Sequence, residues 1–243
     1  MNTDIFMSVV APVFNEEDNI ETVLRYWDSI LASASFSSEI VVTNDGSRDK
    51  TSDILSRLQK EIPRLKVISH EINGGYGRAL STSINNSSGK WVVTLDSDGQ
   101  FDLKEYGLLL NKAQTENLDG VIGFRKKKQD TFIRVYGDRL LNKIVRILFK
   151  TDFKDTNCAF KIIKGPLIRN IYLEARGYPN PTETVIKLSA SGAKLGEIGI
   201  THLEREGGMS KLHPIATGIN FLQFLFFLKL KIVLYNKKIL YKL

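Results

Sequence analysis

Cysteine and histidine are scarce in this chain of 243 residues, which contains one cysteine and three histidines. Cys158 therefore has no partner for a disulfide within the chain, and no His/Asp pattern beside it indicates a thiol nucleophile. With a single cysteine, the scattered histidines, His70, His202 and His213, do not predict a zinc site. This composition favours a reducing, cytosolic compartment.

Long uninterrupted apolar runs are also missing where a targeting or spanning segment would need them. The first residues, MNTDIFMSVVAPVFNEE, lack the basic leader and long apolar stretch of a secretory signal, so we expect none. The longest uncharged stretch near the C-terminus, residues 212–228, is 17 residues long and includes a proline. A membrane span needs about 20 apolar residues, so this stretch is marginal for spanning.

Acidic residues are absent from residues 207–243, which contain six lysines. From Ile219 onward, aromatic and aliphatic residues are mixed with these lysines, which is typical of a helix that lies in a lipid interface. A helix packed on the domain's own surface is the alternative, but the apolar residues between Phe221 and Leu228 would crowd every face of it. We therefore expect residues 212–243 to attach the chain peripherally to the cytoplasmic face of a membrane, with spanning left open.

A second basic block lies at residues 125–150, which hold nine lysines and arginines against two aspartates. Because the net charge of the chain is +7, the rest of the sequence is acidic. Such basic blocks bind nucleic acid, phosphorylated substrates or anionic membrane surfaces. The basic regions contain no recognised nucleic-acid-binding module, so we expect a phosphate ligand and an anionic membrane surface and no nucleic acid.

Apolar, β-rich segments alternate with helical patterns along the first half of the chain. The segments begin at Met7, Ile40 and Trp91, and the helical patterns cover about 19–34, 50–62 and 76–86. This alternation predicts an α/β fold with a mostly parallel sheet flanked by helices. We expect one catalytic domain over residues 1–211 and an amphipathic helical tail over residues 212–243. Later strands are expected near residues 120–124, 159–163 and 196–202, with a basic helix over 130–150.

Polar clusters follow the predicted strands at residues 15–18, 45–49 and 96–100. Ligands of open α/β sheets bind at the carboxyl ends of the strands, so these clusters should face one crevice. Alternation along the chain places Asp96 and Asp98 on the same side, where they can share a cation. Mg²⁺ and Mn²⁺ take such oxygen ligands and keep positions open for phosphate. A simple turn at Asp98-Gly99 is the other interpretation.

The motifs Pro12-Val-Phe-Asn-Glu16, Asn44-Asp45-Gly-Ser-Arg-Asp49 and Asp96-Ser-Asp98-Gly-Gln100 occur in this order and together resemble family 2 glycosyltransferases of the GT-A fold. Later motifs are similar to those of the polyprenyl-phosphate glycosyltransferases, the dolichol-phosphate mannose synthase group. These later motifs are Ile122-Gly-Phe-Arg125, Arg139, Asp155-Thr-Asn-Cys-Ala-Phe160 and the segment from His202 to Lys211, with Arg205-Glu-Gly-Gly-Met-Ser-Lys211 at its end.

The resemblance implies roles for the early motifs. Pro12, Phe14 and Glu16 would line the nucleoside pocket, and Asp45 would contact the base or ribose. Asp96 would lie near the ribose and the metal, while Asp98 and Gln100 would hold Mg²⁺ or Mn²⁺ against the diphosphate. The sequence departs from the family at Asn44, where an Asp is common, and at Gly99, where a Leu is common.

The resemblance also implies roles for the later motifs. Arg125 and Arg139 would bind the acceptor phosphate or the donor diphosphate. Arg205 and Lys211 flank a pair of glycines, in a loop that would close over bound phosphates. Asp155 is the carboxylate expected beside the reaction centre, although a structural role as a loop cap is equally compatible with its position. The expected catalytic residues are thus Asp98, Asp155 and Arg205.

The implied activity is a metal-dependent, inverting transfer of a sugar from GDP-mannose or a UDP-sugar to dolichyl or undecaprenyl phosphate. A phosphate monoester is largely dianionic at neutral pH, so this acceptor needs no strong general base. One alternative is a family 2 enzyme with a hydroxyl acceptor in a glycan or glycolipid, which would require Asp155 as base. Another is a non-catalytic nucleotide-binding adaptor at a membrane. The sequence leaves open the donor, the acceptor lipid and the oligomeric state, including a homo-oligomer.

Overall fold

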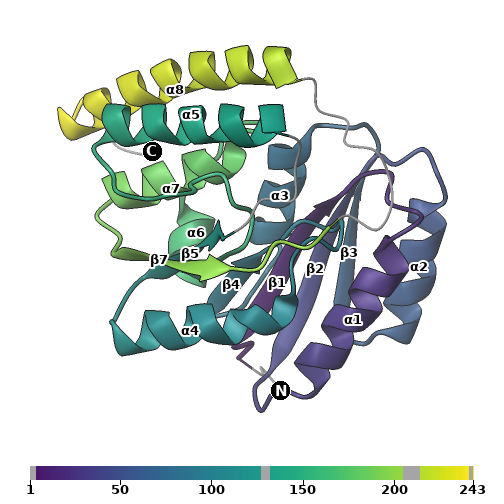
Figure 1. Cartoon of the computed structure of the whole chain (residues 1–243). Coiled ribbons are helices and arrows are strands. Elements are labelled where there is room, and N and C mark those ends of the chain that lie inside the picture. Colours follow the sequence, from purple (N-terminus) through teal and green to yellow (C-terminus); the bar gives the residue numbers. More distant parts are fainter. Residues whose placement is uncertain (1–3, 127–131, 205–213, 241–242) are drawn as a thin grey trace.

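The computed structural model describes residues 4–126, 132–204, 214–240 and 243, which form a sheet with helices on both faces (Figure 1). The strands are β1 Met7–Val13, β2 Ser38–Asp45, β3 Leu65–His70, β4 Trp91–Thr94, β5 Gly120–Arg125, β6 Lys161–Lys164 and β7 Leu195–Ile200. The helices are α1 Ile20–Ala32, α2 Thr51–Glu61, α3 Tyr76–Asn85, the 3-10 turn η1 Leu103–Glu105, α4 Tyr106–Thr115, α5 Phe132–Phe149, α6 Gly165–Asn170, α7 Asn180–Ala190 and α8 Pro214–Asn236.

The seven strands form one sheet in the order β3-β2-β1-β4-β6-β5-β7. β6 runs antiparallel to β4 and β5, and the other neighbouring pairs are parallel. The inner strands are apolar and buried on both faces; every residue of β1, for example, is buried. The sheet order reverses direction beside β1, because the chain builds β2 and β3 on one side and β4 on the other. Ligands of doubly wound sheets bind at such a switch point.

Helices cover both faces of this sheet because their apolar residues recur at helical spacing. In α1, Ile20, Val23, Leu24, Trp27 and Leu31 are buried on one stripe, which packs with residues of α2 and α4 on one face of the sheet. On the other face, residues of α3, α6 and α7 form a second buried cluster with β1, β2 and β4. A mostly parallel α/β sheet flanked by helices was predicted, and it is confirmed.

α8 packs beside α5 and over α7 (Figure 1). Its residues Phe221, Leu225, Leu228 and Ile232 are buried in a third cluster, together with Val145 of α5 and further apolar residues. The helix is therefore partly packed on the rest of the chain, as the alternative of a helix on the domain's own surface predicts. By length and composition its residues 217–236 would suffice to cross a membrane, and only 22% of its apolar window is buried against the rest of the chain. The proposed boundary between residues 211 and 212 lies outside the described residues and stays a prediction.

One strand was not anticipated. β3 is the edge of the sheet, and its residues Lys66, Ser69 and His70 interrupt the apolar pattern that marks the inner strands. Edge strands are half exposed, so their apolar signal is weak. The strand predicted from residue 159 begins at Lys161, and the strand predicted from residue 196 begins at Leu195.

Candidate active site

The loops after β1 and β2 are joined by hydrogen bonds between their backbones and side chains. The backbone N–H of Asn15 donates to Ser47 Oγ at 3.0 Å, and the backbone N–H of Glu16 donates to Thr51 Oγ1 at 2.9 Å. Asn15 has a φ of 52°, a left-handed conformation that asparagine adopts more readily than most residues. These bonds hold Glu16, a predicted nucleoside-pocket residue, beside the start of α2 and the loop that leads to it from β2.

The Asp45 carboxylate organises the loop that leads into α3. It accepts hydrogen bonds from the backbone amides of Gly74, at 3.0 Å to Oδ1, and Gly75, at 2.7 Å to Oδ2. His70 Nδ1 lies 2.7 Å from Asp45 Oδ1, and the Asp45 side chain is 3% exposed. The structure therefore gives Asp45 a loop-organising contact set, while its predicted contact with the base or ribose stays a prediction.

Asp96 and Asp98 follow β4 at the same edge of the sheet. Ser97 Oγ donates to the Pro12 carbonyl at 2.9 Å, so the Asp96–Asp98 segment is fastened to the end of β1. The Tyr76 hydroxyl donates to Asp96 Oδ1 at 2.8 Å. Burial, reinforced by the charge of Asp96, raises the pKa of Tyr76 well above its usual value, so the phenol stays a hydrogen-bond donor at neutral pH.

The loop after Asp98 turns at Gly99, whose φ of +77° is a left-handed conformation that glycine adopts more readily than residues with a side chain. Beyond it, the backbone N–H of Gln100 donates to Asp98 Oδ1 at 3.1 Å. The Gln100 side-chain amide donates to the Leu203 carbonyl at 3.2 Å, and the Leu203 amide returns a 2.9 Å bond to the Gln100 carbonyl. Leu203, two residues before Arg205 in the sequence, is thus bonded to the Asp96–Gln100 loop.

Arg125 and Asp155 form a buried ion pair. Arg125 Nε lies 2.7 Å from Asp155 Oδ2 and Nη2 lies 3.0 Å from Oδ1, while Nη2 also reaches Asp138 Oδ2 at 3.2 Å. Burial opposes the charged form, but the bonds to Asp155 raise the pKa of Arg125 above its usual value. Both residues lie at the same end of the strands as Asp96, because Arg125 is the last residue of β5 and Asp155 precedes β6, which runs antiparallel to β4 and β5.

The remaining predicted residues lie further out or beyond the described part of the chain. Pro12 is buried and Phe14 is partly buried at the end of β1. Arg139 is exposed on α5, one residue after the Asp138 that contacts Arg125. Arg205 and Lys211 lie outside the described residues, so their predicted phosphate contacts stay predictions.

Two residues near this edge were not anticipated from the sequence. No motif predicted a role for Tyr76, which begins α3 among Gly74, Gly75 and Gly77, and close backbone packing at these glycines is the feature that sets it apart. Lys161 of β6 is 2% exposed and donates to the Cys158 carbonyl. Burial lowers the pKa of Lys161 to about 8, against the raising effect of Cys158, Asp155 and Asp96. Cys158 itself is fully buried, and burial raises its thiol pKa to about 12, as expected for an inert structural residue.

The side chains predicted to bind the metal are of the chemical type that suits a divalent cation whose coordination is completed by a substrate. Among the described residues, no group of three or more His, Cys, Asp or Glu could hold a metal ion. Mg²⁺ at phosphate-handling sites commonly uses one or two carboxylates together with phosphate oxygens. Asp96 and Asp98 supply two such carboxylates, and the Gln100 side-chain carbonyl is the third predicted oxygen ligand.

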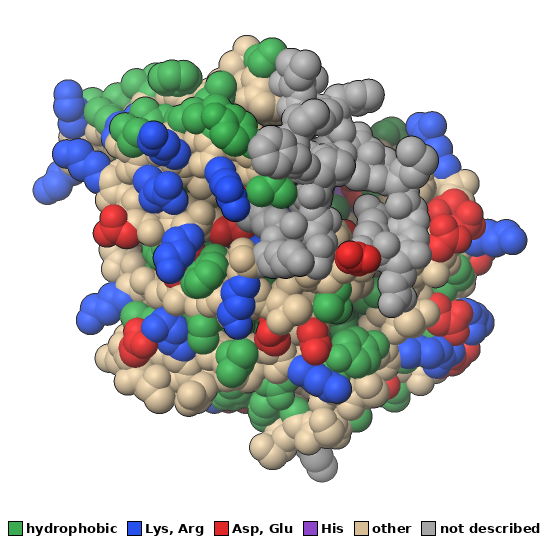
Figure 2. Space-filling model, in the orientation of Figure 1, with side chains coloured by type: hydrophobic (Ala, Val, Ile, Leu, Met, Phe, Trp, Pro, Cys, Tyr) green, Lys and Arg blue, Asp and Glu red, His purple; other side chains and the backbone are tan. Residues whose placement is uncertain are grey.

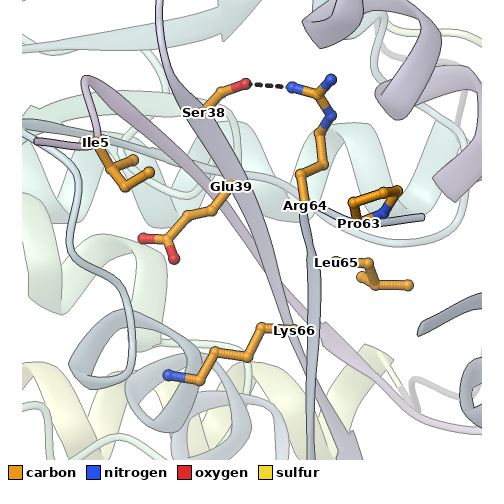
Figure 3. A pocket seen from close by; sticks show the side chains of 7 residues that line it. All are labelled: Ile5, Ser38, Glu39, Pro63, Arg64, Leu65 and Lys66. Carbon is orange, nitrogen blue, oxygen red and sulfur yellow. Dashed lines mark hydrogen bonds between the residues drawn. The ribbon is translucent and has the colours of Figure 1, made fainter. Parts of the chain in front are cut away.

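A hollow lies at the amino ends of the strands, at the opposite end of the sheet from these motifs. It is lined by residues at the amino ends of β2 and β3, among them Ser38, Glu39, Arg64 and Lys66 (Figure 3). Arg64 Nη1 donates to Ser38 Oγ at 2.9 Å, and Lys66 Nζ donates to the Asn86 carbonyl at 3.0 Å. Its polar groups are thus engaged in holding loops, and we assign the hollow no ligand.

The sheet order and the polar loops at the carboxyl ends of the strands define an α/β fold whose switch point is lined by polar loops. Residues 8–175 match the model described as "Glycosyl transferase family 2", and the chain belongs to this family. This confirms the family that the motifs predicted.

Similar proteins include polyprenyl-phosphate transferases. The chain is 26% identical over 210 residues to the "Dodecaprenyl-phosphate galacturonate synthase" of Rhizobium johnstonii, covering 84% of this chain and 61% of that protein. It is 30% identical over 210 residues to the "Undecaprenyl-phosphate 4-deoxy-4-formamido-L-arabinose transferase" of Shewanella sediminis, covering 85% of this chain and 61% of that protein. The chain thus spans less than two thirds of the length of both relatives.

Solved structures show the same fold. The glucosyl-3-phosphoglycerate synthase of Mycobacterium tuberculosis, in complex with Mn²⁺, UDP-glucose and phosphoglyceric acid, superposes with a TM-score of 0.69 at 20% identity. The superposition covers 93% of this chain and 80% of that chain. At this identity the likeness shows the fold alone, and it confirms the predicted GT-A architecture.

Proposed function

We propose that this chain transfers a sugar from a nucleotide-diphosphate sugar to a polyprenyl phosphate at a membrane surface. The proposal rests on one observation. Glu16, Asp45 and the Asp96–Asp98 pair all lie at the carboxyl ends of the neighbouring strands β1, β2 and β4, beside the switch point. Family membership supports sugar transfer, and relatives named for dodecaprenyl and undecaprenyl phosphate support the acceptor class.

In this proposal the donor lies along the edge, with its nucleoside near Pro12, Phe14, Glu16 and Asp45. Asp96, Asp98 and Gln100 would hold Mg²⁺ or Mn²⁺ at the diphosphate. The cation, when bound, supplies charge stabilisation to the departing nucleoside diphosphate. Arg205 and Lys211 would add positive charge at the same phosphates, as hydrogen-bond donors do at sites of developing charge.

The acceptor phosphate would attack the anomeric carbon from the side opposite the leaving diphosphate, which inverts the configuration. The contacts of Asp155 favour this acceptor over a hydroxyl. Its carboxylate is 3% exposed and bonded to Arg125, a setting that stabilises an anion instead of preparing it to take a proton. An acceptor that is already dianionic removes the need for a base. Arg139, exposed on α5, is our candidate for the acceptor phosphate.

The outer faces of α5 and α8 would rest on the membrane. Figure 2 shows hydrophobic side chains gathered at the upper left, over α8, with lysines and arginines beside them. Phe226 is 67% exposed, Leu230 is 60% exposed, and Ile147 of α5 is 68% exposed. Exposed apolar side chains in such number mark an interaction surface, and the absence of acids from residues 207–243 suits an anionic bilayer.

A transfer assay tests the proposal. Protein in vesicles would be incubated with Mn²⁺ or Mg²⁺, a polyprenyl phosphate and a panel of radiolabelled sugar nucleotides. We expect label in an acid-labile lipid monophosphosugar from one donor, lost in Asp98→Ala and kept in Asp53→Ala, which removes an exposed acid of α2. Absence of lipid product from every donor would contradict the proposal and favour a hydroxyl acceptor or a non-catalytic adaptor.

A further inference from the structure

We infer that Tyr76 is a positioning residue, which holds the Asp96 carboxylate in the orientation that binds the metal and diphosphate. The inference rests on the proposed function, because it assigns Asp96 to that group. Its observation is the 2.8 Å hydrogen bond from the Tyr76 hydroxyl to Asp96 Oδ1, which joins the start of α3 to the end of β4.

The backbone that carries Tyr76 is fixed from one side by the segment before α7. The Gly77 amide donates to the Arg176 carbonyl at 2.8 Å. A Cβ at Gly77 would lie 1.7 Å from the Ala175 carbonyl oxygen, so only glycine allows this close approach. At Gly75, with a φ of +93°, a Cβ would lie 2.5 Å from the Arg176 carbonyl oxygen. The start of α3 is therefore packed directly against the backbone of the segment before α7.

The same backbone is fixed from a second side by Asp45, which accepts bonds from the amides of Gly74 and Gly75. Asp45 ends β2 and Asp96 follows β4, and the loop carrying Tyr76 touches both carboxylates. The Tyr76 ring thus extends from an anchored point to Asp96. A donor whose own backbone cannot shift restricts the rotation of the carboxylate that it contacts.

A fixed carboxylate binds a metal more tightly than one that must be ordered at binding. Partners that orient metal ligands in this way typically contribute about 10- to 100-fold to metal affinity. We therefore expect the Tyr76 hydroxyl to act on the affinity for the metal and nucleoside diphosphate together. The hydroxyl contacts Asp96, so it acts through that carboxylate as a positioning residue.

The test is Tyr76→Phe, which removes the hydroxyl and keeps the ring. Tyr26→Phe is the matched control, because the Tyr26 hydroxyl donates to Asp102 Oδ1 at 2.7 Å, an equivalent bond outside the site. The dissociation constants of UDP and GDP would be measured by calorimetry over a series of Mn²⁺ concentrations. At limiting Mn²⁺ we expect Tyr76→Phe to weaken binding of the preferred nucleotide about 10- to 100-fold, and Tyr26→Phe to match the wild type.

Excess Mn²⁺ should restore nucleotide binding in Tyr76→Phe, because the ligands themselves remain. Equal affinities in the two variants at all Mn²⁺ concentrations would overturn the inference. So would failure of the wild type to bind either nucleotide with Mn²⁺, or a loss that excess Mn²⁺ does not restore and that accompanies a lower melting temperature than Tyr26→Phe shows. If the wild type binds nucleotide with Mn²⁺ but transfers no sugar, the proposed function fails while the positioning role stands.

Discussion

Replacement of Asp155 by Asn tests how the Arg125–Asp155 pair contributes to the fold and to the chemistry. The two side chains are 11% and 3% exposed and share two hydrogen bonds, so the substitution removes a charge that a buried guanidinium contacts closely. Breaking a buried pair by removing one partner costs about 3–5 kcal/mol. Asp138, at 3.2 Å from Arg125, still offers a carboxylate, so we expect about 3 kcal/mol.

For a chain of this size, each kcal/mol shifts the melting temperature by about 2–4 °C, so Asp155→Asn should melt about 6–12 °C below the wild type. Thermal unfolding in mild detergent measures the shift. Glu61→Gln is the matched control, because its side chain is 40% exposed and pairs with arginines on the surface. Surface pairs contribute about 0–1 kcal/mol. A shift no larger than that of Glu61→Gln would refute the structural role of the pair.

The same variant separates the two acceptor classes, provided that activity is measured well below its melting temperature. With a phosphate acceptor, no base is lost, and we expect kcat to fall less than about tenfold. A hydroxyl acceptor needs general-base catalysis, whose loss typically costs about 10²- to 10⁴-fold. A loss of that size in folded protein would contradict the phosphate acceptor and support a hydroxyl acceptor with Asp155 as its base.

Further predictions concern a buried lysine and the apolar surface. The pKa of Lys161 is lowered to about 8, so its burial cost is present below pH 8 and disappears as the pH rises toward the unfolded value of about 10.5. In urea unfolding, the wild type should therefore gain about 3 kcal/mol relative to Lys161→Met between pH 7 and pH 10.5; a constant difference would refute this. Phe226→Ser with Leu230→Ser should weaken cosedimentation with anionic vesicles, since each buried apolar side chain contributes about 1.5–3 kcal/mol. Unchanged cosedimentation, with Tyr26→Phe as control, would contradict membrane docking through α8.

The parts of the fold that the sequence predicted are those with strong local signals. The buried strands and the helices from residue 20 to residue 85 have apolar patterns that local periodicity reveals. β3 was missed because an edge strand carries polar residues at several positions. The packing of α8 on α5 and α7 depends on contacts between segments far apart in the sequence, which periodicity does not encode.

The candidate site shows the same limit. The Asp96–Asp98 pair and Asp45 were predicted because each follows a recognisable strand. Arg125 and Asp155 were each assigned a contact with substrate or reaction centre, and their mutual contact across 30 positions became visible only in three dimensions. The Tyr76–Asp96 bond was equally hidden, because it depends on where α3 is seated against the segment before α7.

The acceptor that we propose is a polyprenyl phosphate. A comparison of undecaprenyl phosphate with undecaprenol in the same vesicles, using the sugar nucleotide that the donor panel selects, tests it. We predict labelled lipid from the phosphate alone, with inverted anomeric configuration. Equal labelling of the free alcohol, or a product that retains the donor's configuration, would contradict the proposed reaction.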